Sequence, residues 1–305
     1  MTEAMILEAE MTLRQEGRTF HWARRFLGQG MGQDAARLYA FCRLLDDLAD
    51  GDLPNGARRL MSIRDSLLGN TTALDPALLE FRPFIHVKNL PEDVLIALID
   101  GLLMDQETVL LGTREDLARY SYHVAGTVGI LMCRILDCDS PEATAFAIDL
   151  GIAMQLTNIA RDVLEDAHMG RRYLPGDWVG GITPREIVLA TQEADAMIIK
   201  QVAEGVMRTL SLAETYYESG IMGLSYLPMR AHIAILIAAR AYRQIGLQLA
   251  RQGYNWQDGR QVTSTATKAC SSIAALPLMR YRSKAVLPHD DRLHHGLEGL
   301  PHARG

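Results

Sequence analysis

Cysteine is scarce in this chain of 305 residues: there are four, and none belongs to a C-x-x-C pair. A chain of this length can bury a core without disulfides, so we expect reduced thiols at Cys42, Cys133, Cys138 and Cys270. The N-terminus carries acidic residues where a secretion signal would have a basic and then an apolar region. These two deficits predict a cytoplasmic protein.

Long apolar runs and an excess of basic residues are missing as well. The most apolar stretches, 94–104 and 233–239, are shorter than the roughly 20 residues that a membrane span needs, and Asp100 interrupts the first. Any contact with a bilayer is therefore expected to be peripheral. The net charge of −6 gives no reason to expect nucleic acid as a partner, and an anionic ligand would need help from a cation.

The alternation of apolar and polar residues that marks β-strands is also missing, whereas most segments between turn signals have helical spacing. With 48% hydrophobic and 22% charged residues, this predicts an all-α globular fold. Since no repeat or linker divides the chain, residues 1–280 are interpreted as a single domain. Helices are expected at about 35–50, 56–68, 92–111, 114–136, 141–168, 184–220 and 229–253.

The last part of the chain, residues 281–305, is polar and irregular. Four histidines are scattered through it among proline and glycine: His289, His294, His295 and His302. We interpret this segment as a flexible C-terminal tail, because chain termini are commonly loose. A metal site built from these histidines is the alternative.

Two clusters of acidic and amide side chains lie on two separate predicted helices. Asp46 and Asp50 are four residues apart and share one helix face. Asn158, Asp162 and Asp166 form a second row with the same spacing. Like charges at this spacing repel by a few tenths of a kcal/mol per pair, roughly. A bound cation would offset that repulsion.

Carboxylate and amide oxygens are ligands that Mg²⁺ prefers, and Mg²⁺ commonly completes its octahedron with water and phosphate oxygens. Two rows that face each other could hold a diphosphate through such ions and turn it into a leaving group. Arg43, Arg161, Arg171 and Arg172 lie close to the rows in sequence and could bind phosphate oxygens. The alternative is a pair of solvated acidic helix faces.

Longer motifs around these rows resemble the two signatures of the squalene/phytoene synthase family. They are residues 38–50 and residues 155–166 with the following 170–175, supported by 19–20, 120, 124–129 and 238–246. The resemblance runs from about residue 18 to 270 and implies a single helical bundle of the isoprenoid-synthase type around a central cavity. The implied metal ligands are Asp46, Asp50, Asn158, Asp162 and Asp166, with Mg²⁺ as the cofactor and Mn²⁺ as a substitute.

The same resemblance implies roles for other side chains. Contacts with diphosphate are implied for Tyr39, Arg43, Arg161 and Arg172. The wall of the reaction chamber is implied to include Tyr120, Gln155 and Tyr242. The reaction implied is the head-to-head condensation of two geranylgeranyl diphosphates. It passes through a cyclopropylcarbinyl diphosphate to phytoene, releases pyrophosphate and needs no NADPH, because it ends with loss of a proton.

Other functions stay open at this point. Residues 157–163 and 174–178 look like bacterial phytoene synthases, whereas Ala49-Asp50 is also suggestive of the presqualene-forming branch. One alternative is therefore an enzyme that uses farnesyl diphosphate to make a C30 product: presqualene diphosphate, dehydrosqualene or squalene. Another is an inactive helical assembly subunit, and a third is a metal-dependent phosphohydrolase, although the helices lack the His-Asp cluster expected for it. The sequence predicts no oligomeric state.

Overall fold

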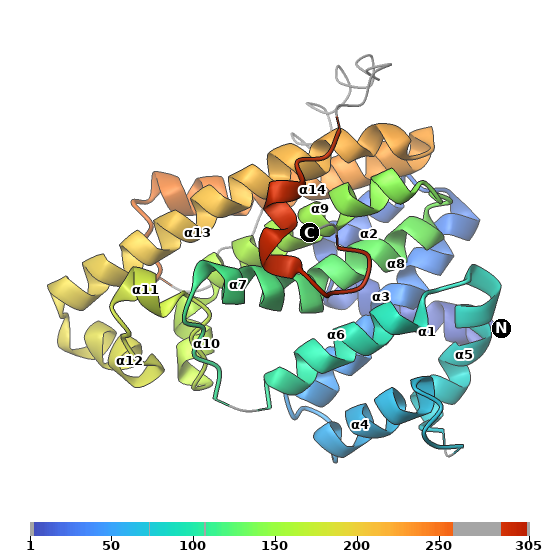
Figure 1. The fold of residues 1–305 in the computed structure, drawn as a ribbon, viewed down its shortest axis with the longest axis horizontal. Coiled ribbons are helices and arrows are strands. Elements are labelled where there is room, and N and C mark those ends of the chain that lie inside the picture. Colours follow the sequence, from blue (N-terminus) through green and yellow to red (C-terminus); the bar gives the residue numbers. More distant parts are fainter. Residues whose placement is uncertain (1–2, 73, 107, 259–287, 304–305) are drawn as a thin grey trace.

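The computed structural model describes residues 3–72, 74–106, 108–258 and 288–303. In these residues every regular element is a helix, apart from an isolated bridge between Leu110 and Arg172, so the predicted all-α class is confirmed (Figure 1). In chain order the helices are α1 (Glu3–Gln15), α2 (Arg18–Arg24), α3 (Gln29–Ala49), α4 (Gly56–Leu67), α5 (Pro76–Lys88), α6 (Glu92–Met104), α7 (Arg114–Ser121), the π-helix η1 (Tyr122–Gly126), α8 (Thr127–Ile135), α9 (Pro141–Arg161), α10 (Val163–His168), α11 (Gly176–Val179), α12 (Pro184–Glu193), α13 (Ala196–Met222), the 3₁₀ helix η2 (Gly223–Tyr226), α14 (Met229–Arg251) and the 3₁₀ helix η4 (Asp291–Leu297).

Several helices begin at side chains that satisfy the first free backbone N–H groups. Thr113 starts α7 with a capping box: its Oγ1 accepts from the N–H of Asp116 at 3.1 Å, and the Asp116 carboxylate accepts from the N–H of Thr113 at 3.0 Å. Thr183 starts α12 in the same way. Asp195 accepts from two N–H groups at the start of α13. Local sequence therefore fixes these boundaries.

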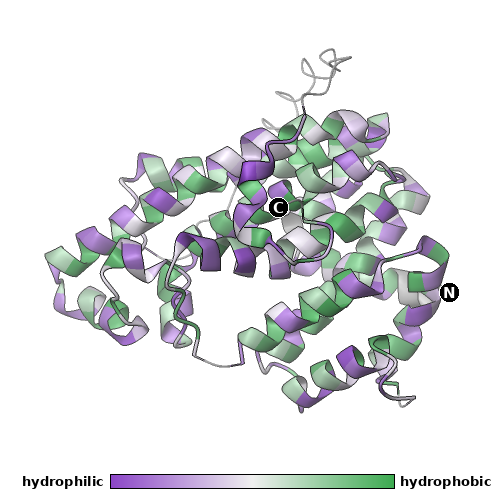
Figure 2. Ribbon diagram, viewed as in Figure 1, coloured by the Kyte–Doolittle hydropathy of each residue, from purple (hydrophilic) through white to green (hydrophobic). Residues whose placement is uncertain are grey.

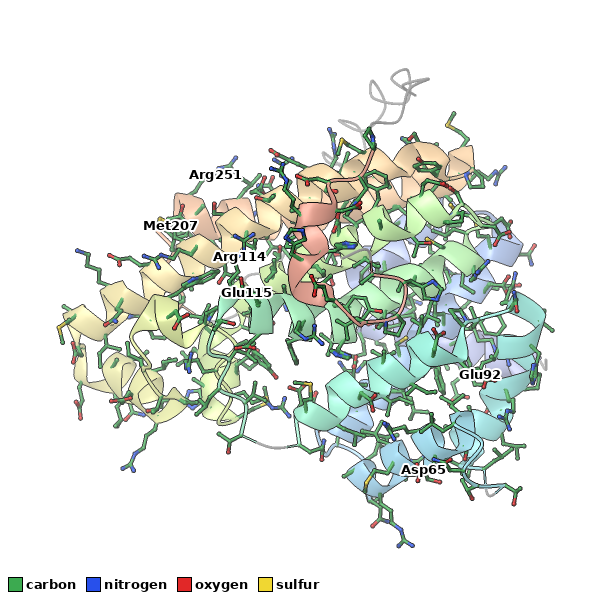
Figure 3. The ribbon with its side chains drawn as sticks, in the orientation of Figure 1. Asp65, Glu92, Arg114, Glu115, Met207 and Arg251 are labelled. Carbon is green, nitrogen blue, oxygen red and sulfur yellow. The ribbon has the colours of Figure 1, made fainter. Side chains whose placement is uncertain are left out.

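Helix α9 forms the middle of the bundle and packs against α13, α8, η1 and α14 (Figure 1). It is buried on several sides, with Ile148, Ile152 and Leu156 fully enclosed. The surrounding helices carry both hydrophobic and hydrophilic residues along their length (Figure 2). Exposed side chains such as Met207 of α13 and Arg251 of α14 lie on the outer surface (Figure 3). The core thus surrounds α9, which also carries the second acidic row.

Three of the predicted long helices are interrupted. The segment 114–136 contains the π-turn η1, and the segment 141–168 breaks at Asp162, whose φ of −104° and ψ of 16° leave the helical region. The segment 184–220 breaks at Ala194, which has a φ of 54° and ends α12 before Asp195 caps α13. The predicted helix 92–111 ends at Met104, and α1, α2 and α5 were not predicted.

The expectation of a loose C-terminal tail is wrong for residues 288–303. This segment forms η4 and packs against α7, with Leu297 fully buried. Arg119 holds it by donating to the carbonyl oxygens of Gly296 at 3.0 Å and Glu298 at 3.1 Å. Tyr216 of α13 donates to the carbonyl oxygen of Leu293 at 2.9 Å. Residues 281–287 lie outside the described residues.

Free cysteines and one long apolar helix bear on the predictions about thiols and membranes. Cys42, Cys133 and Cys138 are free thiols there, and Cys270 lies outside it. Among the described helices, only α9 is long and apolar enough to cross a membrane by those two criteria. Its most apolar window is 67% buried within the protein, as the core helix of a bundle would be.

Helix α9 crosses η1 and α8 at backbone contact, which requires glycine. A Cβ atom on Gly129 would lie 2.2 Å from the carbonyl oxygen of Ala147, and one on Gly151 would lie 2.3 Å from that of Ala125. We expect Gly129→Ala to lower the free energy of unfolding by about 1–3 kcal/mol, because the added methyl must push two helices apart. Urea unfolding followed by circular dichroism would measure this.

Gly30 offers a matched control, because a Cβ on this residue of α3 would meet no atom within 4 Å. Gly30→Ala should leave stability unchanged or raise it by about 0.5–1 kcal/mol, since alanine loses less backbone entropy in a helix. Equal unfolding midpoints for the two variants would contradict the close-packing argument.

Candidate active site

A cavity of about 400 Å³ opens between α2, α3, η1, α8, α9 and α14. Most of its wall is apolar, and polar side chains gather where α3 and α9 contribute their motifs. The apolar part includes Leu38, Val128, Met132, Leu136, Phe146, Leu150, Leu224 and Leu227. The polar part includes Tyr39, Arg43, Asp46, Gln155, Asn158, Arg161 and Tyr242. Such a shape can enclose a long hydrocarbon chain with a polar head.

Helix α3 presents Tyr39, Arg43 and Asp46 to the cavity from one face, because they are spaced by one helical turn. Its other face buries Leu45 and Leu48 in the core, which fixes the rotation of the helix. Burial raises the pKa of Asp46 to about 7, and the neighbouring carboxylates add to this against the opposing charge of Arg43. The site thus holds a carboxyl group whose negative charge Arg43 compensates only in part.

Helix α9 contributes the opposite part of the polar wall with Gln155, Asn158 and Arg161. The Asn158 amide donates to Gln155 Oε1 at 3.3 Å. Its Oδ1 is buried and accepts no hydrogen bond from any described residue. Arg161 donates from Nε to Asp162 Oδ1 at 2.7 Å, just where α9 ends. The Asn158 Oδ1, which accepts no hydrogen bond among the described residues, is available to coordinate a cation.

The two acidic rows continue beyond the cavity wall. Asp50 ends α3 and pairs with Arg171 at 2.9 Å, and Asp166 lies on α10. Burial raises the pKa of Asp166 to about 8, and the charge of Asp162 contributes next. Both rows therefore hold carboxyl groups whose ionised form is disfavoured without a counter-ion.

Asp105 links the two rows and was not identified from the sequence. Its negative charge contributes to the raised pKa of both Asp46 and Asp166, so the three carboxyl groups share one electrostatic environment. Burial also raises the pKa of Asp105 itself. Its only signal in the sequence is a position directly after the strongly apolar helix α6.

These residues fit a divalent metal ion. The Asn158 Oδ1 lacks a partner among the described side chains, and the carboxyl groups of Asp46 and Asp166 are crowded by like charge. All the donor atoms are hard oxygens, as Mg²⁺ and Mn²⁺ require. A cation between the rows would remove the repulsion and fill the free acceptor.

Two residues that were expected to contact substrate lie elsewhere. Tyr120 is only 4% exposed and is not part of the cavity wall: its hydroxyl donates to Asp105 Oδ2 at 2.9 Å, and its ring stacks on Tyr173 at 4.6 Å. Arg172 is buried and donates to the carbonyl oxygens of Leu111, at 3.0 Å, and Leu174. In this structure Tyr120 thus contacts Asp105 and Arg172 contacts the loop before α11, and their expected contacts with substrate stay predictions.

Aromatic rings cover the side of the cavity next to the arginines. Tyr242 of α14 lies 5.3 Å from Phe20 between ring centroids, and Phe20 lies 6.1 Å from Tyr39. All three line the cavity. Ring faces attract positive charge, so this wall can stabilise a carbocation that forms beside the polar end.

Comparison with known proteins agrees with this geometry. The profile of the family named "Squalene/phytoene synthase" matches residues 13–268. The 15-cis-phytoene synthase of Paracoccus sp. (strain N81106 / MBIC 01143) is 34% identical over 87% of this chain and 88% of its own length. The phytoene synthase of Rhodobacter capsulatus is 32% identical over 95% of this chain and 87% of its own.

The fold is also that of a solved relative. A crystal structure of a dehydrosqualene synthase in complex with ligand superposes with a TM-score of 0.77, covers 91% of this chain and 97% of its own, and shares 26% sequence identity. Because the family profile spans most of the chain and these relatives match it over most of their length, the chain belongs to the squalene/phytoene synthase family.

Proposed function

We propose that this protein is a 15-cis-phytoene synthase type of prenyltransferase, which condenses two geranylgeranyl diphosphates head to head in carotenoid biosynthesis. The observation that carries the proposal is a cavity in which Asp46 of the first motif and Asn158 of the second meet a largely apolar chamber. Relatives named phytoene synthase, at 31–34% identity over most of the chain, support the C40 product.

The diphosphate groups bind at the polar end of the cavity. Asp46, Asp50, Asn158, Asp162 and Asp166 are the residues that would hold the divalent ions, for which we propose Mg²⁺. When bound, these ions would neutralise the diphosphate and make it a better leaving group. Arg43, now paired with Asp47, and Arg161, now paired with the proposed ligand Asp162, line the cavity beside these residues and bind diphosphate oxygens.

The chemistry itself needs little from the side chains beyond position and exclusion of water. Pyrophosphate leaves one substrate, and the allylic cation that results is attacked by the double bond of the second substrate. Loss of a proton closes the cyclopropane and gives the cyclopropylcarbinyl diphosphate. Its own pyrophosphate then leaves, the carbon skeleton rearranges, and a further proton is lost to form the central triene.

Cations of this kind react with water, so the apolar wall decides the product. Val128, Met132 and Leu150 offer no hydroxyl or amine that could capture the cation. Phe20 and Tyr242 present aromatic rings to the region where the charge forms. Gln155 accepts a hydrogen bond from the Asn158 amide at 3.3 Å and so orients the amide oxygen that would bind the metal ion.

A C30 product is the second candidate, favoured by the likeness to a dehydrosqualene synthase and a squalene synthase. A direct competition assay separates the two. We expect purified protein with Mg²⁺ and an equal mixture of farnesyl and geranylgeranyl diphosphate to give mainly the C40 hydrocarbon. Each CH₂ that finds apolar wall gains about 0.8 kcal/mol, so five extra carbons strongly favour the longer substrate where the cavity is deep enough.

Products should be separated and weighed by mass spectrometry, with NADPH present in one arm and absent in the other. The C40 triene should appear equally in both arms, because its formation ends with proton loss. Presqualene diphosphate, or squalene only in the arm with NADPH, would reject phytoene and keep the head-to-head chemistry. No product from either substrate would favour the inactive assembly subunit.

A further inference from the structure

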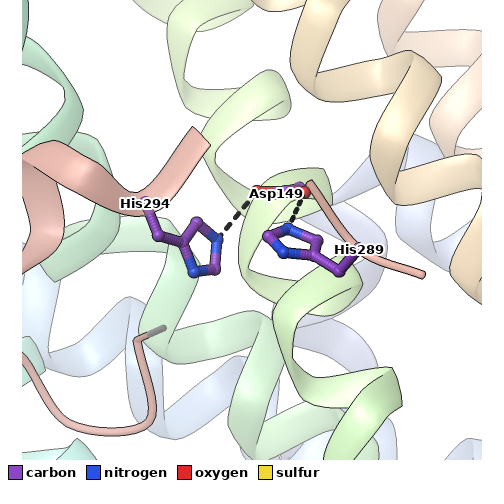
Figure 4. Close-up of side chains that lie close together, drawn as sticks. All are labelled: Asp149, His289 and His294. Atoms are coloured by element: carbon purple, nitrogen blue, oxygen red, sulfur yellow. Dashed lines mark hydrogen bonds and ion pairs between the residues drawn. The ribbon is translucent and has the colours of Figure 1, made fainter. Parts of the chain in front are cut away.

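A buried cluster of Asp149, His289 and His294 joins the C-terminal segment to α9 (Figure 4). Asp149 of α9 is 0% exposed, and its carboxylate faces two histidines of residues 288–303. His289 Nε2 lies 2.9 Å from its Oδ2, and His294 Nε2 lies 3.0 Å from its Oδ1. Ser219 of α13 donates to the same Oδ2. Both histidines thus direct the same ring nitrogen to one carboxylate.

The cluster is separate from the proposed diphosphate site. Leu150, Gly151 and Met154 of α9 line the cavity, whereas Asp149 does not and points toward η4 and α13. The side chains of His289 and His294 are 1% and 0% exposed. Because neither histidine lines the cavity and both side chains are buried, these groups do not contact substrate there.

The surroundings of His289 are those of a metal-bound imidazole. Its Nδ1 lies 3.0 Å from Asp291 Oδ1, while its Nε2 faces Asp149. A neutral imidazole carries one N–H, so it can donate to one of these two carboxylates and must turn a lone pair toward the other. A cation bound at Nε2 removes that conflict, as a second proton on the ring also does. Metal-bound histidines commonly donate their other N–H to a carboxylate in this way.

We propose that Asp149, His289 and His294 bind one divalent transition-metal ion of the zinc class, which fastens residues 288–303 to α9. The three ligand atoms lie within 4.8 Å of one another. Two ligands at about 2.0–2.1 Å from a tetrahedral ion are roughly 3.4 Å apart. The contacts of the two histidines, 2.9 and 3.0 Å to different oxygens of Asp149, are close to that spacing, so side-chain shifts within the cluster bring both nitrogens and a carboxylate oxygen to one ion. The mixed nitrogen and oxygen donors select zinc over magnesium.

The proposed ion lies at the interface between residues 288–303 and the bundle, where other contacts already hold the segment. Leu297 is fully buried, and Arg119 and Tyr216 bind backbone carbonyls of the same segment. The ring of His289 also packs edge-on against Phe146 at 5.3 Å, and Phe146 lines the cavity. Metal bound here therefore stabilises the segment and the wall behind the apolar chamber together.

Full-length protein stripped with a chelator should bind one Zn²⁺ per chain when Zn²⁺ alone is titrated against a chromophoric competitor. Bound Co²⁺ should give the visible absorption of a tetrahedral site, and Zn²⁺ should raise the melting temperature. His294→Gln should weaken Zn²⁺ binding by a hundredfold or more. His295→Gln, which changes an exposed neighbour on the same helix, should bind like the wild type.

Asp291→Asn gives a second test in case His294→Gln does not fold. Its side chain is 62% exposed, and the change keeps all three ligands while altering the partner of His289. We expect about 10–100-fold weaker binding. The proposal is overturned by wild-type protein that binds no Zn²⁺, or by equal affinity in the wild type and His294→Gln. These readouts do not depend on prenyl diphosphates, so they stand or fall separately from the proposed activity.

Discussion

Asp46→Asn should lower kcat by about a hundred- to a thousandfold, the range seen when one group that stabilises developing charge is removed. Asparagine keeps the shape of the side chain but loses the charge that would hold a metal ion against diphosphate. Asp162→Asn should act in the same direction, although it also breaks the pair with Arg161. Initial rates of product formation at saturating Mg²⁺ would measure both.

The fold should survive the change at Asp46, and its pH dependence has a definite sign. Burial raises the pKa of this carboxyl group to about 7 in the metal-free protein. A carboxyl group with a raised folded pKa stabilises the fold fully below its usual pKa near 4 and loses that contribution as pH rises through about 7. The melting temperature of metal-free Asp46→Asn should therefore gain on that of the wild type as pH rises from about 4 to about 7, and the difference should stay level above that.

Asp52→Asn is the matched control, because Asp52 follows the same motif but is exposed and does not line the cavity. Its rate should stay within about twofold of the wild type, as expected for a surface substitution away from the site. Wild-type rates in Asp46→Asn, or a comparable loss in Asp52→Asn, would remove Asp46 from the proposed metal site.

The parts of this protein that sequence could predict are those set by local spacing. The row of Tyr39, Arg43 and Asp46 follows from the 3.6-residue period of α3, whose opposite face carries the buried leucines. The row of Asn158 and its neighbours follows from the same period in α9. The residues of α3 had to share a face because they lie on one helix, whereas the break at Asp162 places Asp166 on α10, which the helical period alone does not predict.

The parts that sequence missed depend on contacts between distant segments. Asp105 stands alone in the sequence, and its place between the two rows arises only when α6 ends beside α3 and α10. Tyr120 was assigned to the chamber from a motif, but its hydroxyl reaches Asp105 and its ring reaches Tyr173. Tyr120 lies near the end of α7, just before η1, and its partners Asp105 and Tyr173 come from segments outside that helix, so helical periodicity does not predict these contacts.

The C-terminal segment illustrates the same limit. Its polar, histidine-rich sequence is typical of a loose tail, because it carries few apolar residues to bury. What anchors it is the charge of Asp149, a buried acid some 140 residues earlier in the chain on α9. Only the folded chain brings that acid to His289 and His294.

The balance of substrate and products with geranylgeranyl diphosphate alone tests the central claim most directly. Purified protein with Mg²⁺, and without any nicotinamide, should convert two substrate molecules into one C40 hydrocarbon with a conjugated triene and release two pyrophosphates. A chelator should abolish turnover while circular dichroism stays the same, because the proposed ions arrive with substrate and do not hold the helices together.

Product formation, pyrophosphate release and ultraviolet absorption can be followed in the same reaction. Head-to-head condensation predicts two pyrophosphates released for each triene formed. After chelation, we expect Mg²⁺ or Mn²⁺ to restore this activity. One pyrophosphate per substrate with a C20 alcohol as the product would mean simple hydrolysis. Full activity after thorough removal of divalent ions would mean that the two acidic rows do not act as a metal site. Either result would contradict head-to-head condensation in this cavity as described.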